Sequence, residues 1–575
     1  MRNNIIKTHE TYRPIWHSFT IALIVALGLG SIIASCGGGG GSAPAATNPP
    51  TTSPPSPQTR FADVTAASGI SFEVSFSKNP GDLADVPFMA GGVGAGDYDG
   101  DDDIDLFVVR GDAGPNLLYR NDGNNIFSEV AAAAGLAFTK SATENYRHSG
   151  PTFADMDGDG DLDLFLGGIQ GDPCRVFSNN GDGTFTDVTA GSGFDGIGAL
   201  QNVSAAFGDY DLEGDLDLLV AHWGVERSGQ DPGDTEHLWR NESTAAQIRF
   251  VSVSVAAGLS PSIITLDDPL SHRPGIDNSF APTFARLNDD LYPDFVMSGD
   301  FNTSMVFMNN ADGTGTFTNV TDVTVIRDWN GMGSALGDYD NDGDLDWFVT
   351  SVYRTFGEVE NGNRLYRNDN GQFVDVTDTA GVDNGGWGWA ACFVDLNNDG
   401  HLDLYHTNGW QNDIDGDYTA DTSRAFISNG DGTFTNWAFS LGLHDNDQGR
   451  GVVCADFDRD GDIDIFLWGN EGPNAGRLFR NDESENNYLF VKLRGLPPNI
   501  EAAGARIRAT IGNETQLREI SIGSNYISQN PTEQHFGLGD APQVDSLVVE
   551  WPDGTMSDVG IVQANQRIVI DNPGF

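Results

Sequence analysis

Short apolar runs alternate with acidic clusters along most of this chain. In chain order, the runs that follow the clusters read IDLFVV, LDLFLG, LDLLVA, LDWFVT, LDLYHT and IDIFLW. A second apolar run precedes each cluster, as in PTFADMD from Pro151 and GVVCADFD from Gly451. Short runs that are rich in aromatic and β-branched residues and bounded by Gly and Asp are typical of strands. The pattern therefore predicts that each acidic cluster joins two β-strands.

Two further patterns recur with the same period. One is a strand that begins with Phe and leads into a turn, usually at Gly, as in FADVTAASGI from Phe61; the other is a segment such as RLYRNDNG near Leu365. Each pattern occurs seven times. Such self-similarity, with several short strands per unit, is typical of a β-propeller. We predict an all-β fold with a seven-bladed propeller over residues 60–484, in which the strand at Phe61 completes the last blade and closes the ring.

Six acidic loops of nine residues carry the candidate chemistry. We number them by repeat unit: loop 1 (97–105), loop 2 (155–163), loop 3 (209–217), loop 5 (338–346), loop 6 (395–403) and loop 7 (456–464). Oxygen-bearing side chains stand at positions 1, 3, 5 and 9, and Gly stands at position 6 except in loop 1, which has Asp102 there. Alternating oxygens with a Gly at the sharp turn are the layout of a calcium loop.

The candidate metal ligands follow from this register. They are Asp97, Asp99, Asp101 and Asp105; Asp155, Asp157, Asp159 and Asp163; Asp209, Asp211, Glu213 and Asp217; Asp338, Asp340, Asp342 and Asp346; Asp395, Asn397, Asp399 and Asp403; and Asp456, Asp458, Asp460 and Asp464. An EF-hand loop would end in a bidentate Glu at position 12. None of these loops has Glu there, so we expect about six structural Ca²⁺ sites between strands rather than between helices.

A seventh loop, loop 4 (286–294), fits the register but has a different chemistry. Its sequence is RLNDDLYPD, with Arg286 in place of the first carboxylate and Leu291 in place of Gly. Two interpretations stay open: the guanidinium pairs with Asp290 or Asp294 where the other loops hold an ion, or it points to solvent. The sequence leaves open whether this loop binds any ion.

The overall charge excludes one class of partner. The chain of 575 residues carries 30 basic and 84 acidic residues, a formal net charge of −54. Such a balance repels a phosphate backbone, so we expect no binding to nucleic acid and no contact with membranes through a basic surface. The acidity outside the loops is what an exported protein needs to stay soluble.

The N-terminal residues predict export. Basic residues precede an apolar run from Phe19 to Ser35, and Cys36 follows directly. A run of this length can also span a bilayer as a permanent anchor. The sequence IIASC looks like a bacterial lipobox, so we expect a lipoprotein signal peptide over residues 1–35, lipidation of Cys36 and a flexible Gly/Pro/Ser/Thr tether over residues 36–59. The predicted location is the cell envelope, as an outer-membrane or surface lipoprotein.

Cysteines and tryptophans add weaker signals. Three further cysteines, Cys174, Cys392 and Cys454, are too few for a disulfide framework; a Cys392–Cys454 bridge and buried free thiols are both open, and the second is favoured. The tryptophans around loop 6 have two interpretations, a contact surface for a sugar or protein and packing between blades. They are Trp387, Trp389 and Trp410.

The repeat stops at Tyr488. Alternating runs such as YLFVKLRG and SLVVEWPDG predict a small antiparallel β domain over residues 485–575. The stretch HFGLGD…VDSLVVEWPDG from His535 resembles the ASPIC/UnbV domain of cartilage-acidic-protein-like proteins, and units such as GMGSALGDYDNDGDLDWFVTS resemble FG-GAP/VCBS repeats of the integrin-α type. The resemblance covers Phe61 to about Val569. It implies an integrin-α-like propeller and extracellular, calcium-supported binding or adhesion.

Catalytic motifs do not emerge from the sequence. It shows no nucleophile elbow, HExxH, phosphate-binding Gly loop or zinc-type Cys/His cluster, and loop carboxylates committed to a cation are unsuited to general acid catalysis. We predict a lipid-anchored binding, adhesion or scaffold protein that recognises an extracellular or envelope protein or glycan through the propeller face. The alternative is an envelope enzyme acting on glycans or lipids, with a site at the propeller channel.

Overall fold

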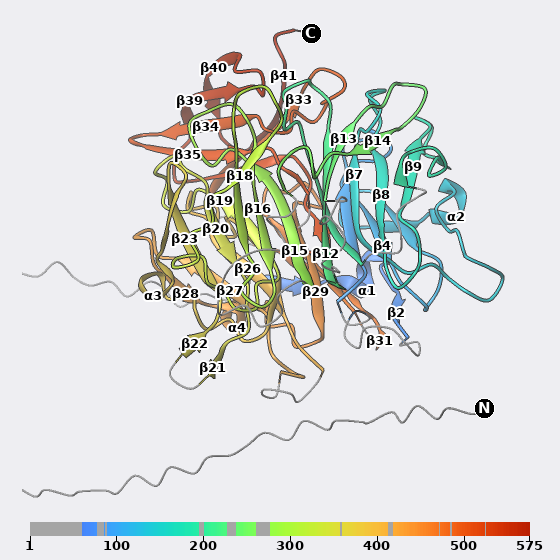
Figure 1. The fold of residues 1–575 in the computed structure, drawn as a ribbon. Coiled ribbons are helices and arrows are strands. Elements are labelled where there is room, and N and C mark those ends of the chain that lie inside the picture. The colour runs from blue at the N-terminus through green and yellow to red at the C-terminus, as the bar shows by residue number, and fades with distance from the viewer. Residues whose placement is uncertain are drawn as a thin grey trace, which may run out of the picture. The chain divides into compact units, whose positions relative to one another are not determined.

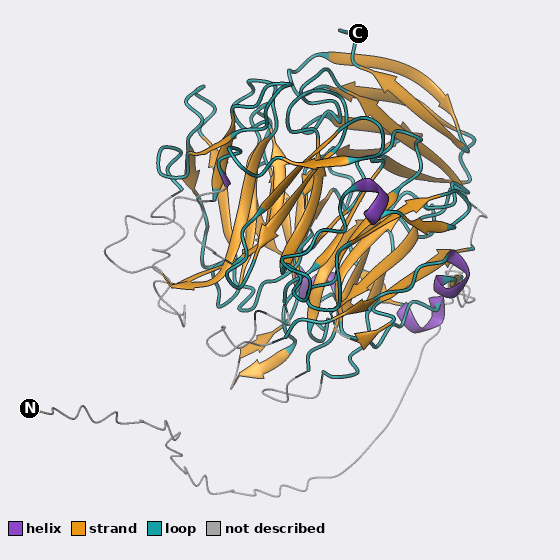
Figure 2. Ribbon diagram, turned by 90° about the vertical axis from the view of Figure 1, so that its right-hand side faces the viewer, coloured by secondary structure: helices purple, strands orange, loops and turns teal. Residues whose placement is uncertain are grey.

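The computed structural model describes residues 60–574, except 78–85, 87–88, 195–200, 227–236, 260–275, 357–358, 412–417, 471, 483–485 and 524. This part of the chain is an all-β structure (Figure 2). Its helices are single turns: α1 (Thr65–Ser68), α2 (Ala131–Ala134), α3 (Thr377–Ala380) and α4 (Ala438–Leu441). None of the helices in the described ranges has the length and apolar character that a bilayer crossing requires.

Each repeat unit contributes four strands that pair in chain order and antiparallel. The first three units are β3 (Gly92–Gly96), β4 (Asp105–Val109), β5 (Leu117–Asn121) and β6 (Phe127–Glu129); β7 (His148–Ala154), β8 (Asp163–Gly168), β9 (Arg175–Asn179) and β10 (Phe185–Asp187); and β11 (Asn202–Gly208), β12 (Asp217–Glu226), β13 (Leu238–Asn241) and β14 (Phe250–Ser252).

The next three units follow the same plan. They are β15 (Ile276–Ala285), β16 (Asp294–Gly299), β17 (Met305–Asn309) and β18 (Phe317–Asn319); β19 (Ser334–Gly337), β20 (Asp346–Val349), β23 (Arg364–Asp369) and β24 (Gln372–Asp375); and β25 (Gly388–Val394), β26 (Asp403–Asn408), β27 (Arg424–Ser428) and β28 (Phe434–Asn436). The long strands β12 and β15 also pair with each other, which joins the sheets of units 3 and 4.

The last unit takes one strand from the beginning of the repeats. It consists of β29 (Gly449–Ala455), β30 (Asp464–Gly469), β32 (Gly476–Asn481) and β1 (Phe61–Asp63). Strand β1 pairs antiparallel with β32, with Phe61 opposite Asn481, which confirms the pairing expected for the strand at Phe61. Two small hairpins lie outside the units: β2 (Glu73–Val74) with β31 (Gly472–Pro473), and β21 (Arg354–Phe356) with β22 (Val359–Asn361).

The first strands of the units lie next to one another in succession. Strand β3 contacts β7, and the series continues through β11, β15, β19, β25 and β29, which in turn contacts β3. Small residues permit this close approach: a Cβ on Gly94 of β3 would lie 3.0 Å from the carbonyl oxygen of Pro151 in β7. The core lies between neighbouring sheets, where Phe107, Phe153 and Leu164 share one buried cluster.

The C-terminal region forms two further sheets, visible at one end of the repeats (Figure 1). One contains β38 (Gln534–Gly539), β33 (Asn487–Arg494) and β41 (Gln566–Asp571); the other contains β35 (Glu514–Glu519), β34 (Arg506–Ile511), β39 (Gln543–Glu550) and β40 (Met556–Gln563). The predicted antiparallel pairing is present in both sheets, but β33 and β41 pair in parallel. These are the first and last strands of the domain, so no hairpin turn fixes their relative direction.

Candidate ion-binding loops

The ninth residue of every loop is built into the sheet. This Asp is the first residue of the second strand in each unit and is fully buried. In loop 3, Oδ1 of Asp217 accepts the backbone N–H of Asn241 at 2.8 Å and Oδ2 accepts that of Tyr210 at 3.4 Å. Loop 4 keeps the same pair of bonds at Asp294. The ninth Asp therefore ties the loop to the third strand whether or not the rest of the loop is acidic.

An Asn on the third strand joins neighbouring units, a role that the sequence analysis missed. The amide of Asn241 donates to the carbonyl oxygen of Met156, the second residue of loop 2, at 3.0 Å. The amide of Asn121 in unit 1 donates to the carbonyl oxygen of Phe457 in loop 7 at 2.9 Å. Equivalent bonds start from Asn179, Asn309, Asn368 and Asn481. The signal was present in the repeated N of patterns such as RLYRNDNG, but its partner lies one unit away.

Carboxylates converge in five of the loops. In each group, one oxygen per residue lies within 4.8 Å of the others. The groups are Asp97, Asp99 and Asp101; Asp155, Asp157 and Asp163; Asp209, Asp211 and Asp217; Asp338, Asp340 and Asp346; and Asp456, Asp458 and Asp460. Oxygens on opposite sides of a Ca²⁺ ion lie about 4.8 Å apart, so the spacing fits that ion.

The remaining predicted ligands stand outside these groups. Asp105, Asp159, Glu213, Asp342 and Asp464 belong to loops whose other carboxylates converge. In loop 6, Asn397 at position 3 is an amide, and its Nδ2 donates to Asp399 at 3.0 Å. Asp395 and Asp403 of the same loop are buried and accept backbone N–H groups of Gly400 and Ser428. Some of the oxygen atoms of loop 6 thus already accept hydrogen bonds from within unit 6.

Several loop oxygens are buried without a partner. Oδ1 of Asp157, Asp209 and Asp458 has no hydrogen-bond donor among the described residues. Burial raises the pKa of Asp105 to about 9 and that of Asp163 to about 8, and the nearby carboxylates add to both shifts. Buried polar atoms are normally paired, and a carboxylate without a counter-charge resists ionisation. Converging, unpartnered oxygens of this kind fit a hard divalent cation.

Loop 4 contains its own cation. Nε of Arg286 donates to the carbonyl oxygen of Asp290 at 2.7 Å, and Nη2 lies 3.2 Å from Oε1 of Glu550. The backbone N–H of Arg286 donates to Glu519 at 2.9 Å, and Arg506 pairs with the same Glu519 at 2.7 Å. Arg286 is 3% exposed, so it does not point to solvent. The predicted partner Asp290 contributes its backbone rather than its carboxylate, and the carboxylate comes from the C-terminal domain.

Basic side chains of the C-terminal domain face several other loops. Lys492 of β33 pairs with Asp102 and Asp97 of loop 1, and Arg567 of β41 pairs with Asp456 of loop 7. Burial raises the pKa of Asp338 and Asp395 in loops 5 and 6 to about 7, and the buried guanidinium of Arg518 in β35 opposes this shift. The unusual Asp102 in place of Gly therefore has a specific partner.

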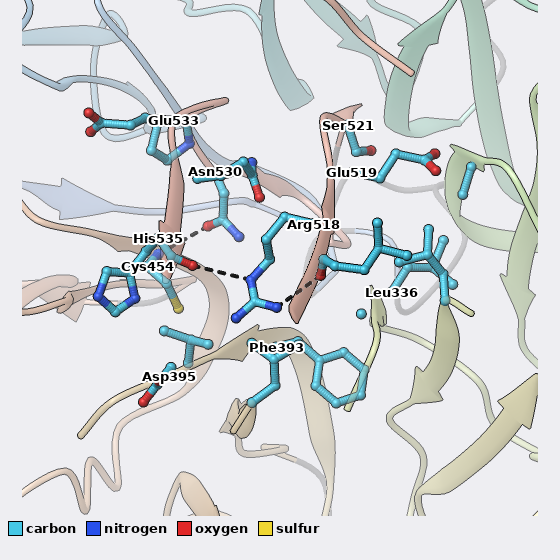
Figure 3. A pocket seen from close by; sticks show the side chains of 18 of the residues that line it. Leu336, Phe393, Asp395, Cys454, Arg518, Glu519, Ser521, Asn530, Glu533 and His535 are labelled. Atoms are coloured by element: carbon cyan, nitrogen blue, oxygen red, sulfur yellow. Dashed lines mark hydrogen bonds between the residues drawn. The ribbon is translucent and has the colours of Figure 1, made fainter. Parts of the chain in front are cut away.

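Arg518 lines a cavity of about 190 Å³ between loops 5 and 6 and the C-terminal strands (Figure 3). Its Nε donates to the carbonyl oxygen of His535 at 3.2 Å and its Nη1 to that of Leu517 at 2.9 Å. Burial lowers the pKa of His535 to about 3, so this imidazole is neutral. The guanidinium is thus oriented by backbone carbonyls and acts on the loop carboxylates at longer range.

A segment of the C-terminal domain enters the space between the first strands of the units. Strand β36 (Ile522–Gly523) pairs with β11, and β37 (Ser528–Gln529) pairs with β3. Tyr526 is fully buried, stacks on Trp389 at 5.4 Å and contacts Phe280 at 5.3 Å. We call residues 520–523 and 525–531 the axial segment.

The three tryptophans pack together beside the axial segment. Trp387 and Trp410 stack with their planes 8° apart, and Trp389 lies between Trp410 and Tyr526. The guanidinium of Arg450 covers Trp389 at 4.3 Å. Trp389 and Trp410 are buried and Trp387 is half-buried. This geometry corresponds to the packing interpretation for Trp389 and Trp410.

For the cysteines, the sequence favoured buried thiols over a Cys392–Cys454 disulfide. Cys174, Cys392 and Cys454 are buried, and none of them forms a disulfide among the described residues. The amide of Asn530 in the axial segment contacts Cys392 at 3.4 Å. The predicted signal peptide, the lipidated Cys36 and the tether lie outside the described residues.

Comparison with protein families identifies the two parts of the chain. A model described as FG-GAP-like repeat matches residues 97–166, 155–220, 286–349 and 352–406. A model described as ASPIC and UnbV matches residues 495–574. The chain therefore contains FG-GAP-like repeats followed by an ASPIC and UnbV domain.

Two proteins of similar sequence are versions of cartilage acidic protein 1. Cartilage acidic protein 1 of Mus musculus is 23% identical over 505 residues, which cover 84% of this chain and 73% of the mouse protein. The Homo sapiens protein is 23% identical over 508 residues, which cover 84% of this chain and 71% of the human one.

Comparison with solved structures gives partial matches, among them a lectin and a biofilm matrix protein. An Agrocybe aegerita lectin that recognises non-reducing terminal N-acetylglucosamine has a TM-score of 0.38 and 19% identity, and the match covers 64% of this chain and 85% of the lectin. The Vibrio cholerae biofilm matrix protein Bap1 has a TM-score of 0.34 and 11% identity, over 74% of this chain and 91% of Bap1.

Proposed function

We propose that this chain is a calcium-stabilised binding or scaffold protein of the cell envelope. Its seven repeat units close into a β-propeller, and Ca²⁺ is held by loops 1, 2, 3, 5, 6 and 7. The observation that carries the proposal is the set of converging loop carboxylates with buried, unpartnered oxygens at Asp157, Asp209 and Asp458. The succession of first strands from β3 to β29 and back to β3 supports closure of the ring.

The role assigned to the ion is structural. Like charges crowded in each loop repel one another, and a bound divalent cation would make the same carboxylates attractive. At a free concentration ten times the dissociation constant, each site stabilises the folded state by about 1.4 kcal/mol. Six independent sites would add roughly 8 kcal/mol, which is comparable with the whole stability of a typical domain.

Thermal unfolding tests this role directly. We expect the melting temperature of the mature protein to rise steeply between excess chelator and millimolar Ca²⁺, and to respond much less to Mg²⁺, which prefers a stricter octahedral geometry. Isothermal titration calorimetry should count several Ca²⁺ ions per chain. Equal melting temperatures with and without chelator would exclude structural calcium.

The binding face is assigned to the ends of the blades away from the C-terminal domain. Lys492, Arg518 and Arg567 place that domain over the acidic loops, and the small hairpin β21–β22 lies at the opposite end (Figure 1). The proposed ligand is an extracellular or envelope protein or a glycan. A pull-down from envelope extract and a glycan array, each with Ca²⁺ and with chelator, test this, and calcium-independent recovery of the same ligands would contradict it.

The membrane attachment is proposed through lipid on Cys36 alone. Metabolic labelling with a fatty acid should label the wild-type protein and leave a Cys36→Ala variant unlabelled and released from the membrane fraction. A variant that stays in the membrane fraction would favour an uncleaved apolar segment instead.

A further inference from the structure

The C-terminal domain brings charges of opposite sign to different acidic loops. On loop 1, Nζ of Lys492 lies 3.3 Å from Oδ2 of Asp97 and 2.6 Å from Oδ1 of Asp102. Asp97 is the first residue of the loop, and its Oδ2 belongs to the carboxylate that converges with Asp99 and Asp101. A fixed ammonium group therefore already neutralises part of the charge that would attract an ion.

Loop 7 has the same arrangement with a guanidinium. Nη2 of Arg567 lies 2.5 Å from Oδ2 of Asp456, the first residue of that loop. Arg567 also pairs with Glu533 and stacks over Phe490 at 3.9 Å, which fixes its position. Loop 7 thus shares its first carboxylate with a side chain that cannot lose its charge.

Loop 2 receives a carboxylate instead. Glu501 lies along a cleft of about 390 Å³ that is lined by Gly160 and Asp161 of loop 2, and also by Asp97 of loop 1 and Lys492. Its Oε1 accepts the hydroxyl of Thr532 at 2.8 Å, whereas its Oε2 is buried and has no hydrogen-bond partner among the described residues. Burial raises the pKa of Glu501 to about 7; the carboxylates of Asp155 in loop 2 and Asp97 in loop 1 add to this shift, and Lys492 opposes it.

Packing holds Glu501 beside loop 2. A Cβ on Gly158 in the middle of this loop would lie 2.7 Å from Cβ of Pro498, so the segment that leads to Glu501 rests directly on the loop. The ion pairs of the described residues include no Lys or Arg paired with a carboxylate of loop 2. Among the acidic loops, loop 2 therefore receives a carboxylate of the C-terminal domain and no basic side chain in an ion pair, whereas Glu519 and Glu550 of that domain face the Arg286 of loop 4.

We propose that the C-terminal domain sets the ion affinity of individual loops, with Glu501 strengthening divalent-cation binding in loop 2, and Lys492 and Arg567 weakening it in loops 1 and 7. The inference rests on the proposed calcium function and adds an order of filling to it. A neighbouring negative charge attracts a divalent cation, and a fixed positive charge that shares its first carboxylate repels it. Loop 2 fills first as Ca²⁺ rises, and loops 1 and 7 fill last.

Variants that each remove one charge test the order in which the loops bind Ca²⁺. Glu501→Gln keeps the shape and the bond to Thr532 and is expected to weaken the tightest site about tenfold, whereas Lys492→Met is expected to strengthen one weak site by a similar factor. Native mass spectrometry at buffered free Ca²⁺ counts the ions bound at each concentration, and isothermal titration calorimetry gives the affinities. Neither readout depends on recognition of a ligand.

Each variant has a matched control. Asp545→Asn removes an exposed carboxylate of the same domain that bonds to Gly512 and Gln543, and Arg249→Met removes an exposed cation that pairs with Glu242. Both controls should leave every affinity unchanged. Circular dichroism of each variant at saturating Ca²⁺ verifies the fold before the affinities are compared.

Double variants assign the effects to loops. If Glu501 acts through loop 2, Glu501→Gln adds no further loss in an Asp157→Asn background, because that site is already lost. Likewise, Lys492→Met has no effect in an Asp99→Asn background. Affinities that stay unchanged in Glu501→Gln and Lys492→Met while the wild-type protein binds several ions would overturn this inference alone. A wild-type protein that binds no Ca²⁺ would overturn the proposed function instead.

Discussion

Loops 3 and 4 have the same backbone register but neutralise their charge in different ways. Both begin after the first strand of a unit and end at a buried Asp, and the bonds from Asn241 to Asp217 and from Asn309 to Asp294 have nearly equal lengths of 2.8 and 2.7 Å. Loop 3 begins with Asp209, whose Oδ1 has no partner in the described structure. Loop 4 begins with Arg286, whose guanidinium is bonded within the loop and to the C-terminal domain.

The comparison separates two roles of the acidic motif: one part of it holds the loop in place, and the other decides how the loop's charge is compensated. The ninth Asp and the Asn on the third strand hold the loop in place in both cases, so this framework needs no ion. The residues at positions 1, 3 and 5 decide how the charge is compensated, by a proposed cation in loop 3 and by Arg286 in loop 4. Glu519 and Glu550 complete this compensation from another domain.

The largest expected effect is the loss of the cation of loop 4. Arg286→Met should destabilise the protein by about 3 kcal/mol, because removing one partner of a buried ion pair leaves the other uncompensated. The effect should be the same in Ca²⁺ and in chelator, as measured by urea unfolding. Arg249→Met, which breaks an exposed pair, should change stability by less than about 1 kcal/mol. A loss that appears only in Ca²⁺ would mean that loop 4 also depends on an ion.

A smaller effect with the opposite dependence is expected in loop 3. Asp209→Asn should cost about 1.4 kcal/mol when free Ca²⁺ is ten times the dissociation constant, since one site is lost. In chelator the same change should be neutral or slightly stabilising, because it removes a buried negative charge. Unfolding curves in both conditions check the difference, with the exposed Asp540→Asn as control. An equal cost in both conditions would make Asp209 a purely structural residue.

Converting loop 4 into an acidic loop sharpens the comparison further. Arg286→Asp with Leu291→Gly restores the sequence register of the other loops and should add one bound ion per chain in calorimetric titration. In Ca²⁺ this double variant should regain about 1 kcal/mol relative to Arg286→Met through the new site. An unchanged ion count would show that position 1 and position 6 alone do not make a site.

The smallest effect is expected at the irregular position of loop 1. Asp102 adopts a φ of 70° and pairs with Lys492, whose side chain is 34% exposed. Asp102→Gly removes a partly exposed pair worth less than about 1 kcal/mol and relieves a left-handed backbone that Gly adopts without strain. The net change in the free energy of unfolding should be within about 0.5 kcal/mol. A loss of several kcal/mol would mean that Lys492 anchors the C-terminal domain.

The sequence predicted the local features correctly. The strands on both sides of each loop and the acidic register follow from short-range patterns, and the structure contains them. The pairing of the strand at Phe61 with the last unit joins the two ends of the repeats, and it followed from the order of the strand types along the repeats. Loop 4 was recognised as different, but its partner was sought among Asp290 and Asp294 in the same loop. Glu550 lies 264 residues further along the chain, and no local pattern connects it with Arg286.

The sequence by itself determined the repeat, the β-strands and the positions of the acidic loops, because these depend on residues within one unit of the chain. Only the tertiary structure decided what each loop faces: Lys492, Arg567 or Glu501 of the C-terminal domain, and the axial segment with Tyr526 between the first strands. These contacts join residues that are hundreds of positions apart, and periodicity reports only on neighbours. The charge around loops 1, 4 and 7 therefore depends on the docking of the C-terminal domain.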